Sequence, residues 1–260
     1  MVDGSGRPAP PANELGSTVR WIARPGASVF VLARDGYPET GAPLVAITED
    51  HCAVRPGWAA GIIAAHAAWP EAAAVGGAIE NGSIASLMDR ASYWITQGPF
   101  QAPLRNGPAD RVATEANLSF KRDVLLEIPD VDGMGSIVLL HLLALRDRGA
   151  VLVNDDAIVV DHFQSVGFGE TSAIHFHNGR TIAAFRRRAG RATEALRWAA
   201  LPLLAPYRAL RVLRIGWTKG RERRWLLASA PAILWLEWCH AAGELLGYVA
   251  GPGRSAEVLR

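Results

Sequence analysis

The sequence predicts an α/β fold, a layer sandwich of strands and helices that is followed by a C-terminal helical segment. Two observations predict it. Short apolar runs typical of buried strands alternate with helical patterns up to residue 170, and no strand pattern recurs beyond that point. Half of the 260 residues are hydrophobic, which is enough material for a sizeable core.

The strand predictions start from the run LVAIT, residues 44–48. Its continuous apolar character is typical of a strand that is buried on both faces of a parallel sheet. In the run AAAVGGAIE, Gly76 and Gly77 would let another group approach the backbone closely. Further strands are predicted at 18–24, 72–80, 117–120 and 150–162, and helices at 25–36, 56–70, 83–97, 121–128 and 135–149.

The chain is predicted to have three parts. Residues 1–16 contain neither the basic nor the apolar segment of a signal peptide, and we expect them to form a flexible arm. An α/β domain at 17–190 and a C-terminal segment at 191–260 follow. Cys52 and Cys239 are the only cysteines, which argues against a disulfide framework and favours a reducing compartment.

Charge is divided unevenly along the chain. Residues 1–179 contain 12 Lys and Arg against 20 Asp and Glu, a net charge of −8, whereas residues 180–224 contain 13 against 2, a net charge of +11. Because long apolar runs interleave with the basic segment, an anionic membrane surface is the expected partner. Nucleic acid is the competing partner for a basic patch, and the apolar runs argue against it.

The second part of the tail, WLLASAPAILWLEWCHAAGELLGYVAG, is long enough to suggest a membrane span. Pro231, Glu237, His240 and Glu244 interrupt it, and a central acidic residue costs roughly 2.5 to 3.5 kcal/mol on insertion. We therefore expect an amphipathic helix that lies in the membrane interface. A helix that folds back onto the domain and a true span are the alternatives.

Three side chains that can bind a metal follow the strand at 44–48 directly. Glu49, Asp50 and His51 stand at a strand end, which is where open α/β sheets bind ligands. Carboxylates suit Mg²⁺ or Mn²⁺, and the softer Mn²⁺ also accepts imidazole. The alternative is a solvated loop whose acidic residues favour the N-terminus of the next helix.

The order of these motifs resembles the family-two glycosyltransferases of the GT-A fold. The resemblance is carried by VAITEDHCAVRPGWAAGIIAAH, AAVGGAIEN, ANLSFKRDVL, VVDHF and HFHNGRTIAAFR, and it covers roughly residues 18–188. It implies a partial GT-A fold, a Rossmann-like three-layer sandwich with a mixed sheet. It also implies a nucleotide-diphosphate sugar as the donor and a divalent metal, Mn²⁺ or Mg²⁺, that is held against the diphosphate.

The resemblance assigns roles to individual residues. It places the metal on Glu49, Asp50 and His51, together with His162 at the end of VVDH, and it places donor or acceptor contacts at Asn117, Gly77 and Arg180. Three of these residues have a structural alternative. Asn117 could be a buried Asn that fixes a loop, His162 a His that caps a turn, and Arg180 an Arg on a solvated helix face. The complete set is Glu49, Asp50, His51, His162, Asn117, Gly77 and Arg180.

Two parts of the family pattern are not found in the sequence. The first strand, helix and second strand that build the nucleotide half are absent before residue 18, so a partner chain that supplies this half is one explanation. The acidic catalytic base is replaced by Gly135, Ser136 and Ile137. Asp130 and Asp132 are the candidates to act as the base instead, and a role in a turn is the alternative for both.

These inferences predict a transferase at the cytoplasmic face of the cell membrane. It would move a sugar from a nucleotide-diphosphate donor to a glycan or a lipid-linked acceptor, as in the synthesis of cell-envelope polysaccharides. The alternative is a non-catalytic glycosyltransferase-like protein that docks at the membrane or binds a partner.

Overall fold

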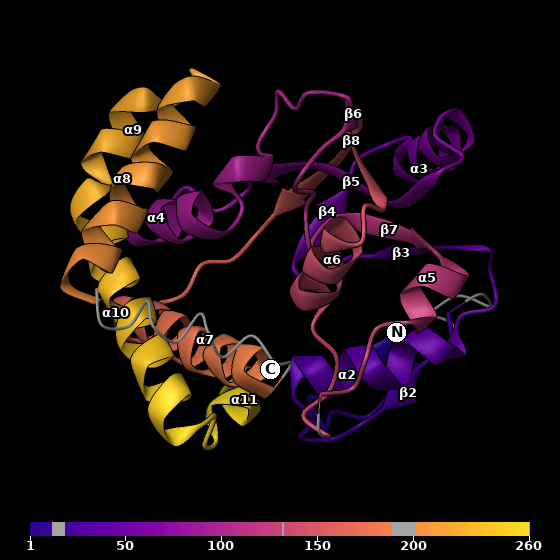
Figure 1. The fold of residues 1–260 in the computed structure, drawn as a ribbon, viewed down its shortest axis with the longest axis horizontal. Coiled ribbons are helices and arrows are strands. Elements are labelled where there is room, and N and C mark those ends of the chain that lie inside the picture. Colours follow the sequence, from indigo (N-terminus) through magenta and orange to yellow (C-terminus); the bar gives the residue numbers. More distant parts are fainter. Residues whose placement is uncertain (12–18, 132, 189–200, 260) are drawn as a thin grey trace.

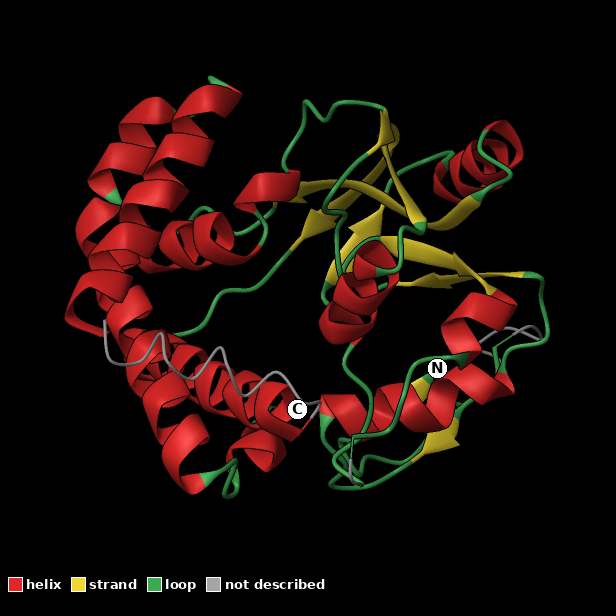
Figure 2. Ribbon diagram, viewed as in Figure 1, coloured by secondary structure: helices red, strands yellow, loops and turns green. Residues whose placement is uncertain are grey.

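The computed structural model shows an α/β protein with a mixed six-stranded sheet and a group of C-terminal helices (Figure 1). It describes residues 1–11, 19–131, 133–188 and 201–259. The sheet and its covering helices form one side of the molecule in this view, and the helices after residue 168 form the other (Figure 2). The α/β prediction is therefore confirmed.

The strand order of the main sheet is β3-β7-β5-β8-β4, and β6 pairs with β8. The central pair, β5 and β8, is parallel, while β3, β4 and β6 run antiparallel to their neighbours. Nine of the ten residues of β5 are buried, as its apolar sequence predicts. The strands are β3 (Leu44–Ile47), β4 (Cys52–Val54), β5 (Ala72–Asn81), β6 (Gly107–Pro108), β7 (Leu118–Lys121) and β8 (Val151–His162).

The run LVAIT forms a strand, as predicted, but it is not a strand buried on both faces of a parallel sheet. β3 lies at one end of the sheet and pairs antiparallel with β7, so it has a neighbour on one side only. Val45 is buried and Ala46 is exposed. A short apolar run does not reveal whether both faces of a strand are covered, and here the face that carries Ala46 is exposed.

Helices cover both faces of the sheet. In β8, Leu152 belongs to the cluster beneath α6, whereas the next residue, Val153, belongs to the cluster beneath α3. Successive side chains of a strand point to opposite faces, so α3 and α6 lie on opposite sides of the sheet. The helices of this part are α2 (Val29–Gly36), α3 (Trp58–Ala68), α4 (Leu87–Thr96), α5 (Arg122–Leu126) and α6 (Val138–Asp147).

The two glycines of β5 show what approaches the strand closely. A Cβ on Gly76 would lie 2.7 Å from the Ala113 backbone nitrogen, and one on Gly77 would lie 2.1 Å from the Ile158 carbonyl oxygen. The groups that need the space are therefore parts of the protein's own chain. Such approaches are one physical reason for glycine inside a strand.

The segment expected to be a flexible arm is partly ordered. Strand β1 (Val2–Asp3) pairs in parallel with β2 (Ile22–Ala23), and the Val2 side chain packs against Gly36 at the end of α2. Ladder hydrogen bonds and this apolar contact hold the first residues, which composition alone could not predict. Residues 12–16 of the same segment lie outside the described residues.

The helices after the sheet form a packed group. Helix α7 (Phe168–Arg188) lies along α10 (Ala230–Ala250), and glycines at the crossing let the backbones come close. A Cβ on Gly243 would lie 2.0 Å from the Phe176 carbonyl oxygen, and one on Gly179 would lie 2.2 Å from the His240 carbonyl oxygen. The remaining helices are α8 (Leu201–Lys219), α9 (Arg223–Ala228) and α11 (Ser255–Val258).

The tail helix folds back onto the protein. Glu244 of α10 is buried and pairs with Arg186 of α7 at 3.0 Å and with Arg208 of α8 at 2.7 Å. Within the described ranges, no helix combines the length and the apolar character needed to cross a membrane. Of the three alternatives for the tail, folding back is the one observed, although the outer face of α10 still exposes Trp235 and Trp238.

We expect Gly243→Ala to destabilise the protein because the added methyl must push α7 and α10 apart. Overpacking of this kind typically costs about 1 to 3 kcal/mol. Gly169→Ala is the matched control, since Gly169 also lies in a helix and has open space at its Cβ position. Urea unfolding measures both free energies, and equal stability of the two variants would contradict the close packing.

Candidate functional site

The residues after β3 form a tight turn that leads into β4. The Cys52 amide donates to the Glu49 carbonyl at 3.0 Å, which closes the turn around Asp50 and His51. Thr48 anchors the start of this turn through a hydrogen bond from its hydroxyl to the Ala116 carbonyl at 3.1 Å. The three polar side chains therefore stand on a fixed backbone at the sheet edge.

Strand pairing brings His162 to this turn. His162 is the last residue of β8, where it pairs with Asn81 of β5 on one side and with Cys52 of β4 on the other. The next amide, Phe163, donates to the His51 carbonyl at 2.8 Å. The register therefore places two histidines, 111 residues apart in sequence, against each other.

Three ligand atoms converge at this point. His51 Nε2 lies 3.1 Å from His162 Nε2 and 3.2 Å from Glu49 Oε2, and His162 Nε2 lies 3.5 Å from the same Glu49 oxygen. Glu49 Oε2 is buried, and neither close nitrogen is aligned to form a hydrogen bond with it. The imidazole rings meet edge to face, with their centroids 4.7 Å apart.

Electrostatics make Glu49 and His51 an ion pair. Burial alone raises the pKa of Glu49, but the contacts with His162 and His51 outweigh it and lower that pKa to about 2. The Glu49 carboxylate in turn raises the pKa of His51 to about 9, against the opposing effect of burial. At neutral pH the site therefore holds an ionised carboxylate beside an imidazolium.

The geometry fits a metal ion. Ligand atoms about 2.0 to 2.2 Å from a common ion lie roughly 3 to 3.5 Å from one another, which matches the three distances observed here. Cys52 Sγ also belongs to a group whose ligand atoms lie within 4.8 Å of each other, together with Glu49 and His162. Two imidazoles disfavour Mg²⁺, which prefers oxygen ligands, and leave Mn²⁺ as the better match of the two expected ions.

The structure places Asp50 outside the convergent atoms. Its side chain is 94% exposed, and its Oδ1 lies 3.0 Å from His51 Nδ1, on the far side of that ring from Glu49. A carboxylate in this position orients the imidazole and sets its tautomer. Glu49, His51 and His162 are thus brought together, while Asp50 contacts the cluster through His51.

Asn117 and Gly77 serve the internal structure of the sheet. The Asn117 amide donates to the Ala78 and Ile158 carbonyls at 2.8 and 2.9 Å, and its oxygen accepts from Trp58 Nε1 at 2.9 Å. Asn117 is buried, and it also occupies the space that a side chain at Gly77 would need. The structural alternative, a buried Asn that fixes a loop, describes these contacts, and a role in donor binding stays a prediction.

Arg180 and Asp130 also make structural contacts. Arg180 Nε donates to the Gly251 carbonyl at 2.9 Å, and Arg180 lies 12 residues into α7, about 18 Å from the start of that helix. Asp130 accepts from the Gly135 amide at 2.9 Å and from Arg34 at 3.2 Å, which is the turn role considered from the sequence. Asp132 lies outside the described residues.

Two residues near the cluster carry chemistry that the sequence reasoning did not assign. The turn Glu49–Cys52 returns Cys52 to the cluster, and burial raises the pKa of its thiol to about 11. Burial also raises the pKa of Glu115, and the charge of Glu49 adds to this shift. The signal in the sequence was the position of Glu115, directly before the segment ANLSF.

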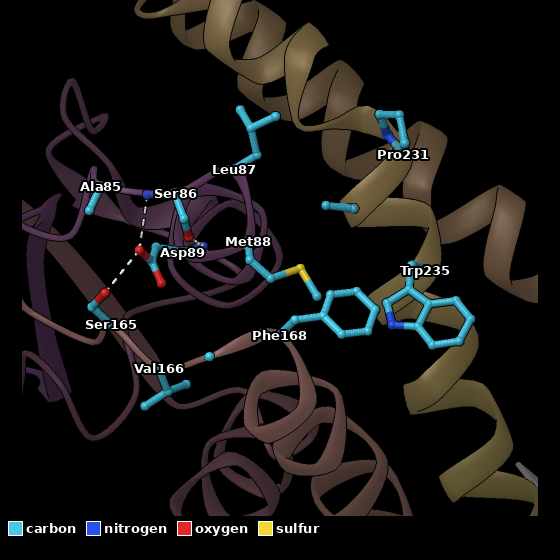
Figure 3. Close-up of a pocket in the computed structure, with 12 residues that line it drawn as sticks. Ala85, Ser86, Leu87, Met88, Asp89, Ser165, Val166, Phe168, Pro231 and Trp235 are labelled. Carbon is cyan, nitrogen blue, oxygen red and sulfur yellow. Dashed lines mark hydrogen bonds between the residues drawn. The ribbon is translucent and has the colours of Figure 1, made fainter.

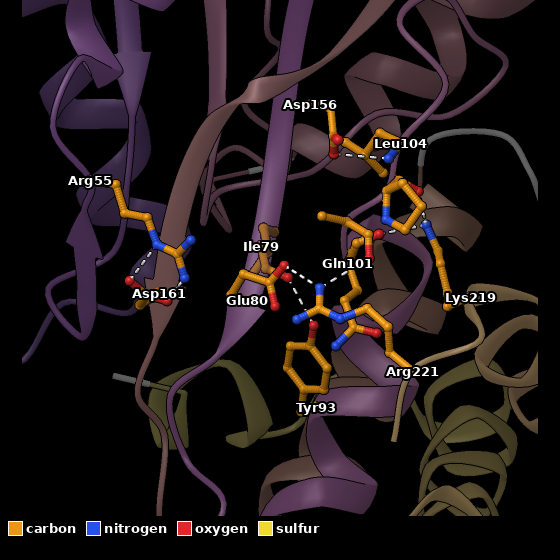
Figure 4. Close-up of polar contacts among 12 residues, drawn as sticks. Arg55, Ile79, Glu80, Tyr93, Gln101, Leu104, Asp156, Asp161, Lys219 and Arg221 are labelled. Atoms are coloured by element: carbon orange, nitrogen blue, oxygen red, sulfur yellow. Dashed lines mark hydrogen bonds and ion pairs between the residues drawn. The ribbon is translucent and has the colours of Figure 1, made fainter. Parts of the chain in front are cut away.

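Ion pairs surround the strand ends next to the cluster (Figure 4). Arg55 binds Asp161 through two hydrogen bonds of 2.9 and 2.6 Å, which joins β4 to β8 one residue before His162. On β5, Glu80 accepts from Arg221 at 2.6 Å. Because Arg221 lies between α8 and α9, this contact ties the C-terminal helices to the strand that carries Asn81.

Comparisons of the chain with protein-family models, with curated proteins and with solved structures find no match.

We expect Mn²⁺ to bind the wild-type protein and Glu49→Gln to weaken that binding at least about tenfold, because a negatively charged ligand is lost. Asp50→Asn is the matched control, since Asp50 is exposed and only orients His51. It should change the affinity by less than Glu49→Gln does. Isothermal titration calorimetry measures both affinities. A larger loss of Mn²⁺ affinity for Asp50→Asn than for Glu49→Gln would contradict the assignment of Glu49 as a ligand.

Metal binding should release about one proton at pH 7.5, because His51 must deprotonate before it can coordinate. The pKa of His51 is raised to about 9 and that of Glu49 is lowered to about 2, so His51 carries the proton that is lost and Glu49 is already ionised. The affinity should therefore rise as the pH increases toward 9. Calorimetry in buffers of different ionisation enthalpy counts the protons, and a count of zero would contradict this protonation state.

Proposed function

We propose that the protein is a membrane-associated glycosyltransferase of the family-two type. It uses a nucleotide-diphosphate sugar and a divalent metal, and it transfers the sugar to a glycan or a lipid-linked acceptor. One observation carries the proposal: Glu49 and His51, which follow β3, converge within 3.5 Å with His162, the last residue of β8. The resemblance placed the metal on these three residues and on Asp50.

The chemistry of the cluster suits a diphosphate donor. A bound Mn²⁺ would neutralise the negative charge that develops on the departing nucleoside diphosphate. Glu49 is already ionised at neutral pH, and His51 could join it as a ligand once it loses its proton. Asp50 holds His51 through its Nδ1 and so sets which nitrogen faces the metal.

A base for the acceptor hydroxyl is the second requirement. Asp130 has its carboxylate engaged by Gly135 and Arg34, which leaves it poorly placed to accept a proton. Glu115 is the alternative carboxylate because it lies close enough to the cluster for the charge of Glu49 to add to the effect of burial in raising its pKa. We therefore add Glu115 to Asp130 and Asp132 as candidates.

The surface of the C-terminal helices supports attachment to a membrane. Helix α8 exposes Leu203, Tyr207, Leu210 and Trp217, which recur along one side of the helix. Among residues 201–224, seven Lys and Arg accompany one Glu, a net charge of +6. Aromatic and aliphatic side chains beside cationic ones are the combination that binds anionic lipid at its interface. A peripheral position on the cytoplasmic face follows as part of the proposal.

A non-catalytic glycosyltransferase-like protein is the second candidate, and one observation favours it. Among the described residues, β3 is the end strand of the sheet, and strands of a nucleotide half could pair with its outer edge. A partner chain that pairs with this edge would supply the missing half. In that arrangement the protein alone would bind metal and transfer nothing.

If the protein is a glycosyltransferase, a nucleotide-diphosphate sugar should raise the melting temperature of the Mn²⁺-loaded protein. At a concentration 100 times the dissociation constant, the stabilisation is about 2.7 kcal/mol. A panel of uridine-, guanosine- and thymidine-diphosphate sugars identifies the donor.

Glu49→Gln should abolish this thermal shift, and Asp50→Asn should retain it. Release of nucleoside diphosphate then separates an enzyme from a binding protein. A thermal shift without product would favour the second candidate, and the lack of a shift with every donor would remove the main support for the first.

A further inference from the structure

The thiol of Cys52 lies at the cluster and has no part in the proposed function. Its Sγ, a carboxylate oxygen of Glu49 and a ring nitrogen of His162 lie within 4.8 Å of one another. The second cysteine, Cys239, is a residue of α10 and stands outside this group. A thiolate beside a carboxylate and imidazoles changes which ion a site prefers, because sulfur ligands select softer metals than oxygen ligands do.

Strand pairing aims the side chain of Cys52 at that of His162. The two residues stand directly opposite each other in the antiparallel pair of β4 and β8, so their side chains lie on the same face of the sheet. The neighbouring pair is hydrogen-bonded, since the Phe163 amide donates to the His51 carbonyl at 2.8 Å. Cys52 and His162 therefore form the other kind of antiparallel pair, in which opposite side chains come closest.

The backbone that carries His162 is fixed on both sides. The Gly82 amide donates to the His162 carbonyl at 2.9 Å. Three residues further on, the Ser165 hydroxyl donates to Asp89 at 2.9 Å, at the start of α4 (Figure 3). A ligand residue on a fixed backbone loses little freedom when it binds an ion, which favours affinity.

The carboxylate of Glu49 supplies an atom that needs a partner. Its Oε2 is buried and makes no aligned hydrogen bond, although it lies 3.2 Å from His51 Nε2 and 3.5 Å from His162 Nε2. A buried acceptor that lacks a hydrogen bond is costly, and native proteins have few of them. A cation bound among this oxygen, the two ring nitrogens and the thiolate would satisfy it.

The four side chains are the donor set of a tetrahedral zinc ion. Zn²⁺ binds thiolate, imidazole and carboxylate in this geometry, whereas Mg²⁺ and Mn²⁺ favour oxygen ligands and gain little from sulfur. Bond lengths of about 2.0 to 2.3 Å place the ligand atoms roughly 3.3 to 3.8 Å apart. The spacing of the Glu49 oxygen and the two histidine nitrogens is already close to this range, and the half-buried Cys52 thiol needs to move by about 1 Å.

We propose that Glu49, His51, Cys52 and His162 bind Zn²⁺ as four protein ligands. Because a tetrahedral ion with four protein ligands has no open position, Zn²⁺ closes the site to a diphosphate. Mn²⁺ leaves the thiol unbound and keeps positions for phosphate oxygens, so the two ions have opposite effects on donor binding. This regulation by Zn²⁺ rests on the proposed glycosyltransferase function; the Zn²⁺ site itself does not.

The test uses the full chain and Zn²⁺ alone. X-ray absorption of the Zn²⁺-loaded wild type should show one sulfur at about 2.3 Å among nitrogen and oxygen ligands at about 2.0 to 2.2 Å. In competition with a chelator, Cys52→Ser should lower the Zn²⁺ affinity at least about tenfold and leave the Mn²⁺ affinity within about twofold of wild type. Cys239→Ser is the matched control, because Cys239 is also a half-buried free cysteine, and it should change neither affinity.

Co²⁺ in place of Zn²⁺ gives a second readout of the thiolate. The wild type and Cys239→Ser should show a thiolate-to-cobalt charge-transfer band with the absorption of tetrahedral Co²⁺, and Cys52→Ser should lack that band. Equal Zn²⁺ affinity of Cys52→Ser and wild type would overturn the proposal. So would a Zn²⁺ spectrum of the wild type without sulfur, a measurement that needs no variant and decides the question even if Cys52→Ser does not fold.

Thermal shifts with nucleotide-diphosphate sugars separate this inference from the proposed function. The Mn²⁺-loaded protein should respond to a donor, and the Zn²⁺-loaded protein should not. A sulfur ligand to Zn²⁺ without a donor response in Mn²⁺ would support the zinc site and remove the transferase proposal, whereas a donor response without a sulfur ligand would do the reverse. An equal donor response with both ions would contradict closure of the site by Zn²⁺.

Discussion

The pairing of β8 with both of its neighbours is the constraint on which the candidate site depends. His162 is held by β5 on one side and by β4 on the other, at the register Asn81↔His162 and Cys52↔His162. A slip of one residue would turn His162 to the opposite face of the sheet. The ion pair of Arg55 with Asp161 stabilises this register, so the two histidines meet because the strands are aligned by backbone hydrogen bonds and by this side-chain contact.

The sequence predicted where the strands lie along the chain better than it predicted which strands pair with one another. The strands at LVAIT and AAAVGGAIE and the helix that begins at Trp58 lie where their patterns placed them, because apolar periodicity and proline or glycine boundaries act locally. The edge position of β3 and the ordering of Val2 depend on pairing with distant segments. Pairing partners are not encoded in a local pattern, which is why these two features could not be predicted.

The candidate site shows the same division. Glu49 and His51, two residues apart at a strand end, were candidate ligands from position, and the resemblance added His162, which lies in the cluster. Asp50 differs because the turn Glu49–Cys52 rotates it outward and brings Cys52 back. Asn117 and Arg180 matched motif positions, yet their donors serve carbonyl groups of the protein. A motif specifies residue types, and only the three-dimensional contacts decide whether a polar side chain is free to bind a ligand.

The C-terminal helices and the sheet share one apolar cluster, in which Ile79 of β5 lies with Leu226 and Ile233 of the helices, and polar contacts add to it. Arg221 donates to Glu80 at the end of β5, and Lys219 donates to the carbonyls of Gln101 and Pro103 (Figure 4). Burial lowers the pKa of Lys219, which indicates that its contacts with the protein have replaced much of its water. These residues stand between the exposed apolar face of α8 and the strand that pairs with His162. Under the proposed function, the surface for lipid and the site for the charged donor are joined through these contacts, so the fold sets the position of the membrane relative to the cluster.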